Sequence, residues 1–222
     1  MEKISKQQYQ ALIKGALLLE EDAFGIKVLD TGKGEMIKLF RRKRLLSTAL
    51  FFPYACRFVA NAKKLAQLGI PTVSINKLLW CPSIKRHLVI YQKLEGELLR
   101  TILSQSVDQT EELYEKFGRF IAHLHQKGIY FRSAHLKNIL VLATGEFGLI
   151  DISDMQIKPQ PLQQSLRLRN FSHILRYPED KVLIRSQLDA FMLGYTNESK
   201  LTSAAALAIE NEIRTLVIKA SS

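Results

Sequence analysis

Two oxygen-bearing side chains, Asn138 and Asp151, stand at the ends of what the sequence predicts to be a β-hairpin. The hairpin comprises two short apolar runs, residues 139–142 and 147–152, joined by Ala-Thr-Gly-Glu, which is typical of a turn. Asn138 opens the first strand and Asp151 closes the second, so both side chains project from the same end. Oxygen ligands in this arrangement suit a hard cation such as Mg²⁺. Taken singly, each residue is also explained as part of a turn.

Three further polar side chains could act together with Asn138 and Asp151. Arg132 and His135 lie in the loop just before Asn138, and Lys38 lies on a strand much earlier in the chain. This setting favours a functional interpretation of the pair over two unrelated turns.

The first half of the chain must supply a sheet that carries Lys38. Apolar runs at residues 16–19, 25–29 and 36–40, separated by 20–22 and 31–34, predict a three-stranded antiparallel meander. Strands at 73–79 and 87–91 extend it to five.

Two helices are predicted in the same half. Ser5 and Gln8 have the spacing of a capping box, which predicts a short opening helix. A second helix buries Phe58, Ala62 and Leu65 on one face and ends at Gly69.

The second half is predicted to be mostly helical. Asp108 and Glu111 open an amphipathic helix that Gly128 closes, the hairpin follows, and a last helix lies near residues 204–220. A β-rich half followed by a helical half predicts an α+β fold.

Composition excludes several classes of protein. With 47% hydrophobic residues the chain can bury a core, which argues against disorder, and two cysteines are too few for a disulfide framework. The N-terminus has no run of signal-peptide type, and the apolar stretch 45–55 falls short of the roughly 20 residues of a membrane-spanning helix. We expect a protein of the reducing cytoplasm.

The net charge of the chain, +11, points to an anionic partner: a phosphate-rich small molecule, a membrane face or nucleic acid.

Residues 128–140, Gly-Ile-Tyr-Phe-Arg-Ser-Ala-His-Leu-Lys-Asn-Ile-Leu, resemble the catalytic loop of the protein-kinase-like fold. That loop reads His-Arg-Asp, four residues, Asn and then an Ile-Leu strand. Residues 149–153 resemble the Asp-Phe-Gly region, and residues 36–39 resemble the strand with the phosphate-binding lysine. Within this fold, the compact size and the segments 68–72 and 124–129 look most like the bacterial lipopolysaccharide core kinases of the Kdo and heptose (WaaP) type.

The resemblance implies one bilobal domain over residues 1–222. A small antiparallel-sheet N-lobe with one main helix would cover residues 1–91, a hinge 92–96, and a mostly helical C-lobe 97–222.

The resemblance also implies ATP and Mg²⁺ as cofactors. Lys38 would contact the ATP phosphates, Asn138 and Asp151 would hold Mg²⁺, and the hinge residues Gln92 to Leu94 would face adenine. The turn that ends at Gly25 would cover the nucleotide. Phosphoryl transfer needs charge neutralisation and alignment more than covalent help, which these groups can supply.

Three positions depart from the kinase pattern. Ser133 occupies the position of the catalytic aspartate, Phe131 that of the histidine, and Phe58 that of the helix glutamate that pairs with the lysine. Serine cannot accept a proton as a carboxylate does, so His135 and Asp154 become the candidate bases, with Arg132 beside them. His135 is equally explained as a solvated loop residue or a phosphate contact.

Two basic clusters bear on the partners. The tract 41–44, followed by apolar and aromatic residues up to Tyr54, suits either a solvated face or contact with an anionic membrane surface. Arg167, Arg169 and Arg176 lie where an anionic acceptor would bind. No RNA- or DNA-binding motif accompanies either cluster, so nucleic acid ranks last among the partners.

The leading hypothesis is ATP-dependent phosphorylation of a lipid-linked sugar of the lipopolysaccharide core. We expect a peripheral protein at the inner face of the cytoplasmic membrane. The alternative is a nucleotide-binding pseudokinase that acts as an interaction module in envelope biogenesis, and Ser133 is the residue that separates the two. A kinase of proteins or small molecules is a third reading, because fold does not fix function. The sequence leaves the acceptor, the base and the oligomeric state open.

Overall fold

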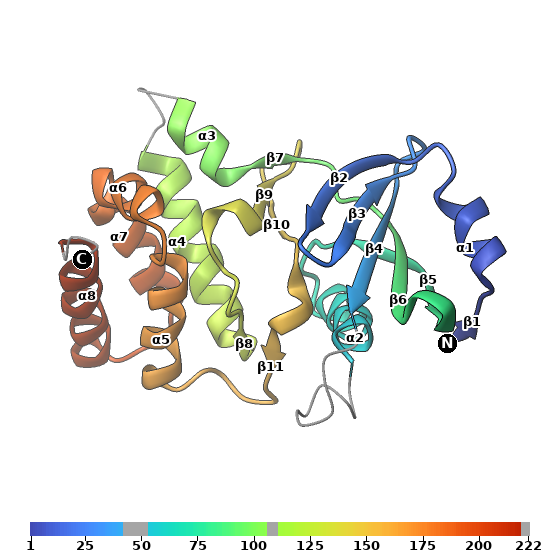
Figure 1. The fold of residues 1–222 in the computed structure, drawn as a ribbon. Helices are drawn as coiled ribbons and strands as arrows, with labels where there is room; N and C mark the ends of the chain where they lie inside the picture. Colours follow the sequence, from blue (N-terminus) through green and yellow to red (C-terminus); the bar gives the residue numbers. More distant parts are fainter. Residues whose placement is uncertain (42–52, 106–110, 219–222) are drawn as a thin grey trace. The chain divides into compact units, whose positions relative to one another are not determined.

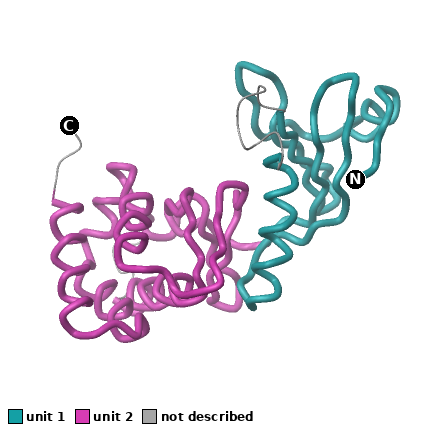
Figure 2. The backbone as a smooth tube through the Cα atoms, turned by 90° about the horizontal axis from the view of Figure 1, so that it is seen from below, with its two compact units in different colours: residues 1–94 teal, residues 95–222 magenta. Residues whose placement is uncertain are grey.

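The computed structural model describes residues 1–41, 53–105 and 111–218 (Figure 1). The backbone divides into two compact units, Met1–Leu94 and Glu95–Ser222, which Figure 2 shows in different colours. The first is built on a sheet and the second is mainly helical, as the sequence predicts.

The sheet of the first unit has six strands in the order β1-β5-β6-β4-β3-β2. Their bounds are β1 Glu2–Lys3, β2 Leu17–Asp22, β3 Gly25–Asp30, β4 Glu35–Arg41, β5 Ser74–Cys81 and β6 Arg86–Gln92. The five predicted strands are confirmed, and their neighbouring pairs are all antiparallel. The sixth, β1, pairs in parallel with β5. It contains only two residues, too few for an apolar alternation to be recognised.

The hairpin of β2 and β3 corrects one predicted turn. Residues 20–22 were predicted to separate the strands, yet they continue β2, and only Ala23 and Phe24 turn. Lys27 forms an ion pair with Glu20 across the hairpin, and the Phe24 N–H donates to Asp22 Oδ1 over 2.8 Å. Acidic residues are stable here because β2 is an edge strand whose side chains are exposed.

The helices of the first unit match their predictions. Helix α1, Lys6–Ile13, has the capping box, with the Gln8 N–H donating to Ser5 Oγ over 3.1 Å. Helix α2, Tyr54–Gln67, buries the predicted apolar face, and Gly69 follows with φ +73°, a left-handed conformation that suits glycine. A 3₁₀ turn, η1, covers Pro82–Ile84.

The second unit contains the remaining helices and two small sheets. Its helices are α3 Leu99–Gln105, α4 Glu111–Gln126, α5 Gln164–Ile174, α6 Pro178–Ser186, α7 Leu188–Glu198 and α8 Ser203–Ile218. One sheet joins β7 Glu97–Leu98, β9 Ile139–Val141 and β10 Phe147–Leu149, and the other joins β8 Ile129–Tyr130 and β11 Gln156–Ile157. The predicted hairpin is confirmed as β9 and β10, which pair antiparallel. Asp108, the predicted cap of α4, lies outside the described residues.

Helices α4 and α7 form the most extensive helix contact of the described residues. Glycines let their backbones approach: a Cβ on Gly118 would lie 2.0 Å from the Phe191 carbonyl oxygen, and one on Gly194 would lie 1.9 Å from that of Glu115. The ring of Phe117 packs against that of Phe191, with centroids 5.3 Å apart. No helix within residues 1–41, 53–105 and 111–218 combines the length and hydropathy of a membrane span.

Candidate active site

Asn138 makes hydrogen bonds to two other residues of the loop between β8 and β9. It ends a 3₁₀ turn, η2 Leu136–Asn138, and its side chain is buried. Its Nδ2 donates to the Ser133 carbonyl oxygen over 2.9 Å and lies 3.2 Å from His135 Nε2. Both amide hydrogens are therefore used, which fixes the orientation of the amide. Within the described part of the chain, Oδ1 accepts no hydrogen bond and is left available for a cation.

Asp151 lies next to Asn138 in the fold. The Ile150 N–H donates to the Asn138 carbonyl oxygen over 3.0 Å, which ties the end of β10 to the start of β9. Asp151 itself is exposed and has φ +50°, a left-handed conformation that costs energy for a residue with a Cβ. Strain of this kind is often found at functional sites. The loop therefore presents an amide oxygen and a carboxylate at one end of the hairpin.

This donor set fits Mg²⁺, which binds through one or two carboxylates while keeping waters and substrate phosphates as its other ligands. A cluster of three or more His, Cys, Asp or Glu side chains suited to a metal is absent from the described residues. A Mg²⁺ ion shared with phosphates requires no such cage. Asn138 and Asp151 are thus the two side chains that would hold it.

Ser133, at the position of the catalytic aspartate, is paired with a carboxylate. Its Oγ donates to Asp154 Oδ2 over 2.8 Å. Asp154 ends the 3₁₀ turn η3, Ile152–Asp154, and its Oδ1 is buried without a hydrogen-bond partner among the described residues. The position that holds a carboxylate in kinases therefore holds a hydroxyl here, and this hydroxyl is hydrogen-bonded to the carboxylate of Asp154.

His135 supports the loop through one hydrogen bond and one ring contact. Its Nε2 accepts from Asn138, and the ring packs edge-on against Tyr177 with centroids 5.0 Å apart. Burial lowers the pKa of His135, so the ring is neutral near pH 7 and can accept that hydrogen bond. Its Nδ1 is buried and has no hydrogen-bond partner in the described residues. A role as the base remains a prediction, and the contacts suit a supporting role better.

A buried ion pair anchors the same loop. Asp180, in the first turn of α6, is fully buried, and its Oδ2 accepts from the Leu136 N–H over 3.2 Å. Its Oδ1 lies 2.7 Å from Arg100 Nε, within ion-pair distance but without the alignment of a hydrogen bond. Nothing in the spacing of the sequence marks these two residues, which are far apart in the chain.

A second buried network holds the start of the loop. Asn170 Nδ2 donates to the Phe131 carbonyl oxygen over 2.7 Å, and its Oδ1 lies 3.2 Å from His125 Nε2. The other ring nitrogen of His125 lies 3.0 Å from the Tyr195 hydroxyl. His125 has no exposed surface. These bonds connect α4, α5 and α7 to the backbone of the loop.

His125 predicts a specific loss of stability in acid. Burial, and then the charge of Arg167, lower the pKa of His125 from 6.5 to about 3. The unfolded chain takes up a proton as the pH falls through 6.5, whereas the native chain does so only near 3. The free energy of unfolding should therefore fall by a few kcal/mol over this window. Urea melts at a series of pH values should show a flatter dependence in His125→Gln than in His123→Gln, the control on the same helix.

The predicted cluster of Arg167, Arg169 and Arg176 contains one buried arginine and two exposed ones. Arg167 was expected to bind an acceptor, and the structure corrects this, because only 2% of its surface is exposed. Its Nε donates to the Leu162 carbonyl oxygen over 2.8 Å, so the guanidinium makes hydrogen bonds inside the protein. Arg169 and Arg176 are exposed, as is Arg132.

The three exposed arginines surround one histidine. Burial, and then the charges of Arg132, Arg169 and Arg176, lower the pKa of His173, while Asp154 raises it. The His173 ring is held by the Tyr130 hydroxyl, 3.0 Å from Nε2. These three arginines and Asp154, the carboxylate that binds Ser133, thus act on the same histidine.

In the first unit, Lys38 lies on β4 between β3 and β6. Its Nζ is 5.6 Å from the ring centroid of Phe58 and 5.9 Å from that of Phe40, within range of a cation–π interaction. Phe58, at the position of the kinase glutamate, therefore contacts the lysine through its ring. The role of Lys38 toward phosphates remains a prediction.

The other predicted nucleotide contacts also lie in the first unit. Gly25 follows the turn of β2 and β3 with φ +104°, and the Arg41 guanidinium lies 3.6 Å from the adjoining Phe24 ring. Gln92 is the exposed last residue of β6, and Leu94 is half-buried at the end of the unit. Their contacts with a nucleotide remain predictions.

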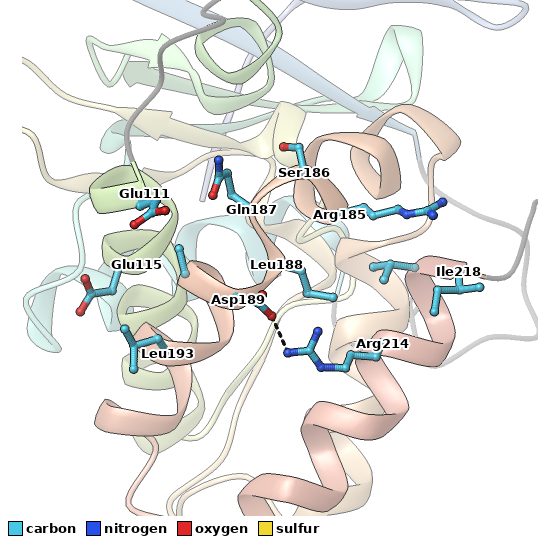
Figure 3. Close-up of a pocket in the computed structure, with 12 residues that line it drawn as sticks. Glu111, Glu115, Arg185, Ser186, Gln187, Leu188, Asp189, Leu193, Arg214 and Ile218 are labelled. Carbon is cyan, nitrogen blue, oxygen red and sulfur yellow. Dashed lines mark hydrogen bonds and ion pairs between the residues drawn. The ribbon is translucent and has the colours of Figure 1, made fainter.

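A separate pocket of about 650 Å³ lies among α4, α6, α7 and α8 (Figure 3). Arg214 extends into it and is held by Asp189 and Glu210, each 2.6 Å from its Nη2. None of the residues that line it was predicted as a site residue, and the catalytic-loop side chains lie elsewhere.

The comparisons with known proteins bear on the fold and the family of the chain. A crystal structure of monomeric WbdD superposes with a TM-score of 0.51 at 20% identity, covering 83% of this chain and 44% of that one. A structure of the bifunctional kinase-methyltransferase WbdD gives a TM-score of 0.48 at 16% identity, covering 85% and 42%. The chain thus spans less than half the length of these proteins, and the likeness to monomeric WbdD supports the kinase-like fold. No curated protein matches the sequence. Residues 31–195 match the Lipopolysaccharide kinase (Kdo/WaaP) family, and since this is most of the chain, the protein belongs to that family.

Proposed function

We propose that the protein transfers the γ-phosphoryl group of ATP to a sugar of the lipopolysaccharide core. The observation that carries the proposal is the position of Asn138, whose amide hydrogens are used within the loop and whose main-chain carbonyl oxygen is bonded to Ile150, the neighbour of Asp151. Membership in a family of lipopolysaccharide kinases supports the same reaction class.

The residues of the chain supply positioning and charge. Asn138 and Asp151 would hold Mg²⁺, which neutralises charge on the phosphates, and Lys38 would add a second positive charge. Asp180 and Asn170 fix the backbone of the loop, so the donor set is oriented before the nucleotide binds. Such preorganisation is the main source of rate in phosphoryl transfer.

The acceptor is proposed to be an anionic, lipid-linked sugar. Arg132, Arg169 and Arg176 are exposed beside Asp154, and guanidinium groups bind phosphate or carboxylate in bidentate fashion. An acceptor hydroxyl next to such an anionic group could be held by these arginines close to Ser133.

A peripheral position on the inner face of the cytoplasmic membrane is proposed with it. Leu17, Leu18 and Leu19 of β2 are exposed, as is Phe24 in the following turn. Apolar side chains together with a net charge of +11 suit an anionic bilayer surface. The basic and aromatic segment that first suggested membrane contact lies mostly outside the described residues, in 42–52.

The second candidate is a nucleotide-binding pseudokinase that acts as an interaction module. Ser133 favours it, because a serine in place of the catalytic aspartate removes the direct proton acceptor. The two candidates share MgATP binding and differ in transfer. Labelled ATP and deacylated lipopolysaccharide core oligosaccharide should therefore yield labelled oligosaccharide with the native chain and none with Asp151→Asn. Absence of label with the native chain would favour the pseudokinase.

Binding of MgATP should raise the melting temperature of the protein. A ligand present at 100 times its Kd stabilises the folded state by about 2.7 kcal/mol, which is a shift of several degrees for a chain of this size. We expect the Mg²⁺-dependent part of the shift to disappear in Asp151→Asn and to persist in Glu146→Gln, a control in the turn of the same hairpin. Equal shifts with and without Mg²⁺ in the native chain would contradict a metal at Asn138 and Asp151.

A further inference from the structure

The contact between Ser133 and Asp154 joins two segments that are separate in the sequence. Ser133 belongs to the loop after β8, and Asp154 follows β10 in η3. Their side chains meet at 2.8 Å, with the serine as donor, because an ionised carboxylate can only accept. The hydroxyl hydrogen is thus directed at Asp154, which leaves the lone pairs of Oγ free to accept from another group.

Asp154 is held firmly in this position. Ile152 and Ser153, which precede it in the turn, are buried, and the Met155 N–H donates to the Ile152 carbonyl oxygen over 3.3 Å. Its second oxygen, Oδ1, is buried and accepts no hydrogen bond from the described residues. A carboxylate with an unused buried oxygen is held mainly by its bond to Ser133, which is unexpected for a purely structural aspartate.

We propose that Ser133 and Asp154 together replace the catalytic aspartate, with Ser133 relaying the acceptor's proton to Asp154. The inference rests on the proposed kinase function. As the acceptor oxygen forms its bond to the γ-phosphorus, the bond from phosphorus to the β–γ bridging oxygen breaks and ADP leaves. The acceptor proton passes to Ser133 Oγ while the serine proton passes to Asp154 Oδ2. Asp154 later returns the proton to water through Ser133.

The neighbouring groups favour Asp154 over His135 as the final proton acceptor. Nε2 of His135 is occupied by Asn138, and its Nδ1 is buried. Ser133 is only half-buried and is therefore accessible to an acceptor hydroxyl. Arg132, Arg169 and Arg176 act on His173 together with Asp154, so they are placed to bind an anionic acceptor near this carboxylate.

The test measures transfer from labelled ATP to deacylated lipopolysaccharide core oligosaccharide. Asp154→Asn and Ser133→Ala should each lower kcat by roughly 10²-fold to 10⁴-fold, the usual contribution of a general base, with the KM for ATP unchanged. The double variant should be no slower than either single one, because the two groups act as a unit. Ser153→Ala is the matched control, since its Oγ is buried without a partner in the described residues, and should keep native activity.

Rescue separates a proton relay from a structural contact. Ser133→Asp combined with Asp154→Asn places a carboxylate directly at the acceptor and should restore at least tenfold of the lost kcat. Native activity in Asp154→Asn, or a failure of this rescue, would overturn the relay and leave the kinase function standing. Should Asp154→Asn not fold, the comparison of Ser133→Ala with Ser153→Ala decides, and equal rates would overturn the relay. No transfer by the native chain to oligosaccharide or water would overturn both proposals.

Discussion

Gly194→Ala is expected to abolish the native packing of the helical unit. The new Cβ would lie 1.9 Å from the Glu115 carbonyl oxygen and 2.9 Å from its Cα, so backbone atoms of α4 would have to move. A flexible side chain could turn aside, but a helix backbone fixed by its own hydrogen bonds cannot. Separating α4 from α7 would also open the aromatic packing around Phe117 and Phe191. We expect a loss of 4 kcal/mol or more, comparable to the stability of a marginal domain.

Circular dichroism and urea unfolding of the purified variant would measure this loss. Gly145→Ala is the matched control, because it adds the same methyl group in a turn with nothing within 4 Å. Gly145 has φ +81°, so the control should lose only the roughly 1–2 kcal/mol of a left-handed alanine. Gly118→Ala, facing the Phe191 carbonyl oxygen, should behave like Gly194→Ala. Equal stabilities of Gly194→Ala and Gly145→Ala would contradict the backbone contact.

Asp180→Ala is expected to cost about 3–5 kcal/mol and to disorder the catalytic loop. The substitution leaves the Arg100 guanidinium, whose side chain is 14% exposed, without its carboxylate. It also leaves the Leu136 N–H without its acceptor in the interior. Both costs arise at the turn that positions Asn138. Urea melts should therefore show lower stability, and Mg²⁺-dependent ATP binding should weaken as well.

Two further variants test why Asp180→Ala should lower the free energy of unfolding. Glu112→Ala breaks an exposed ion pair with Lys116 on α4 and should leave the free energy of unfolding nearly unchanged, because solvent screens exposed charges. Replacing Arg100 and Asp180 together with leucines should cost less than Asp180→Ala, because no unpaired charge remains. A double variant less stable than the single one would show that the ion pair itself supplies the stability.

Local patterns predicted most of the elements. The capping box of α1, the apolar face of α2 and the glycine that follows it each depend on neighbouring residues, and the structure confirms them. The β9–β10 hairpin was likewise evident from two apolar runs and a turn. The acidic end of β2 misled the prediction, because its strand character depends on backbone pairing with β3 at an exposed edge of the sheet.

The residues of the candidate site fall into the same two groups, those that local patterns predict and those that they do not. Asn138 and Asp151 could be selected from the sequence because both belong to one short hairpin motif. The residues that hold the loop could not: His125, Asn170 and Asp180 have types that occur on any surface, and burial alone distinguishes them. Arg167 was assigned to an acceptor for the same reason, since its sequence neighbours do not reveal that its donors point into the core.

The sequence by itself determined the order of the elements, the kinase-like fold and the loop that carries Asn138 and Asp151. The order of the elements follows from apolar periodicity and turn chemistry, which act between residues close in the chain. The kinase-like fold and the role of the loop follow from the resemblance of residues 36–39, 128–140 and 149–153 to kinase motifs. Only the tertiary structure decided what replaces the missing carboxylate at Ser133. Asp154 reaches it across 21 residues, by way of a hairpin and a 3₁₀ turn. Such a contact depends on how the segments pack, and no spacing in the sequence encodes it.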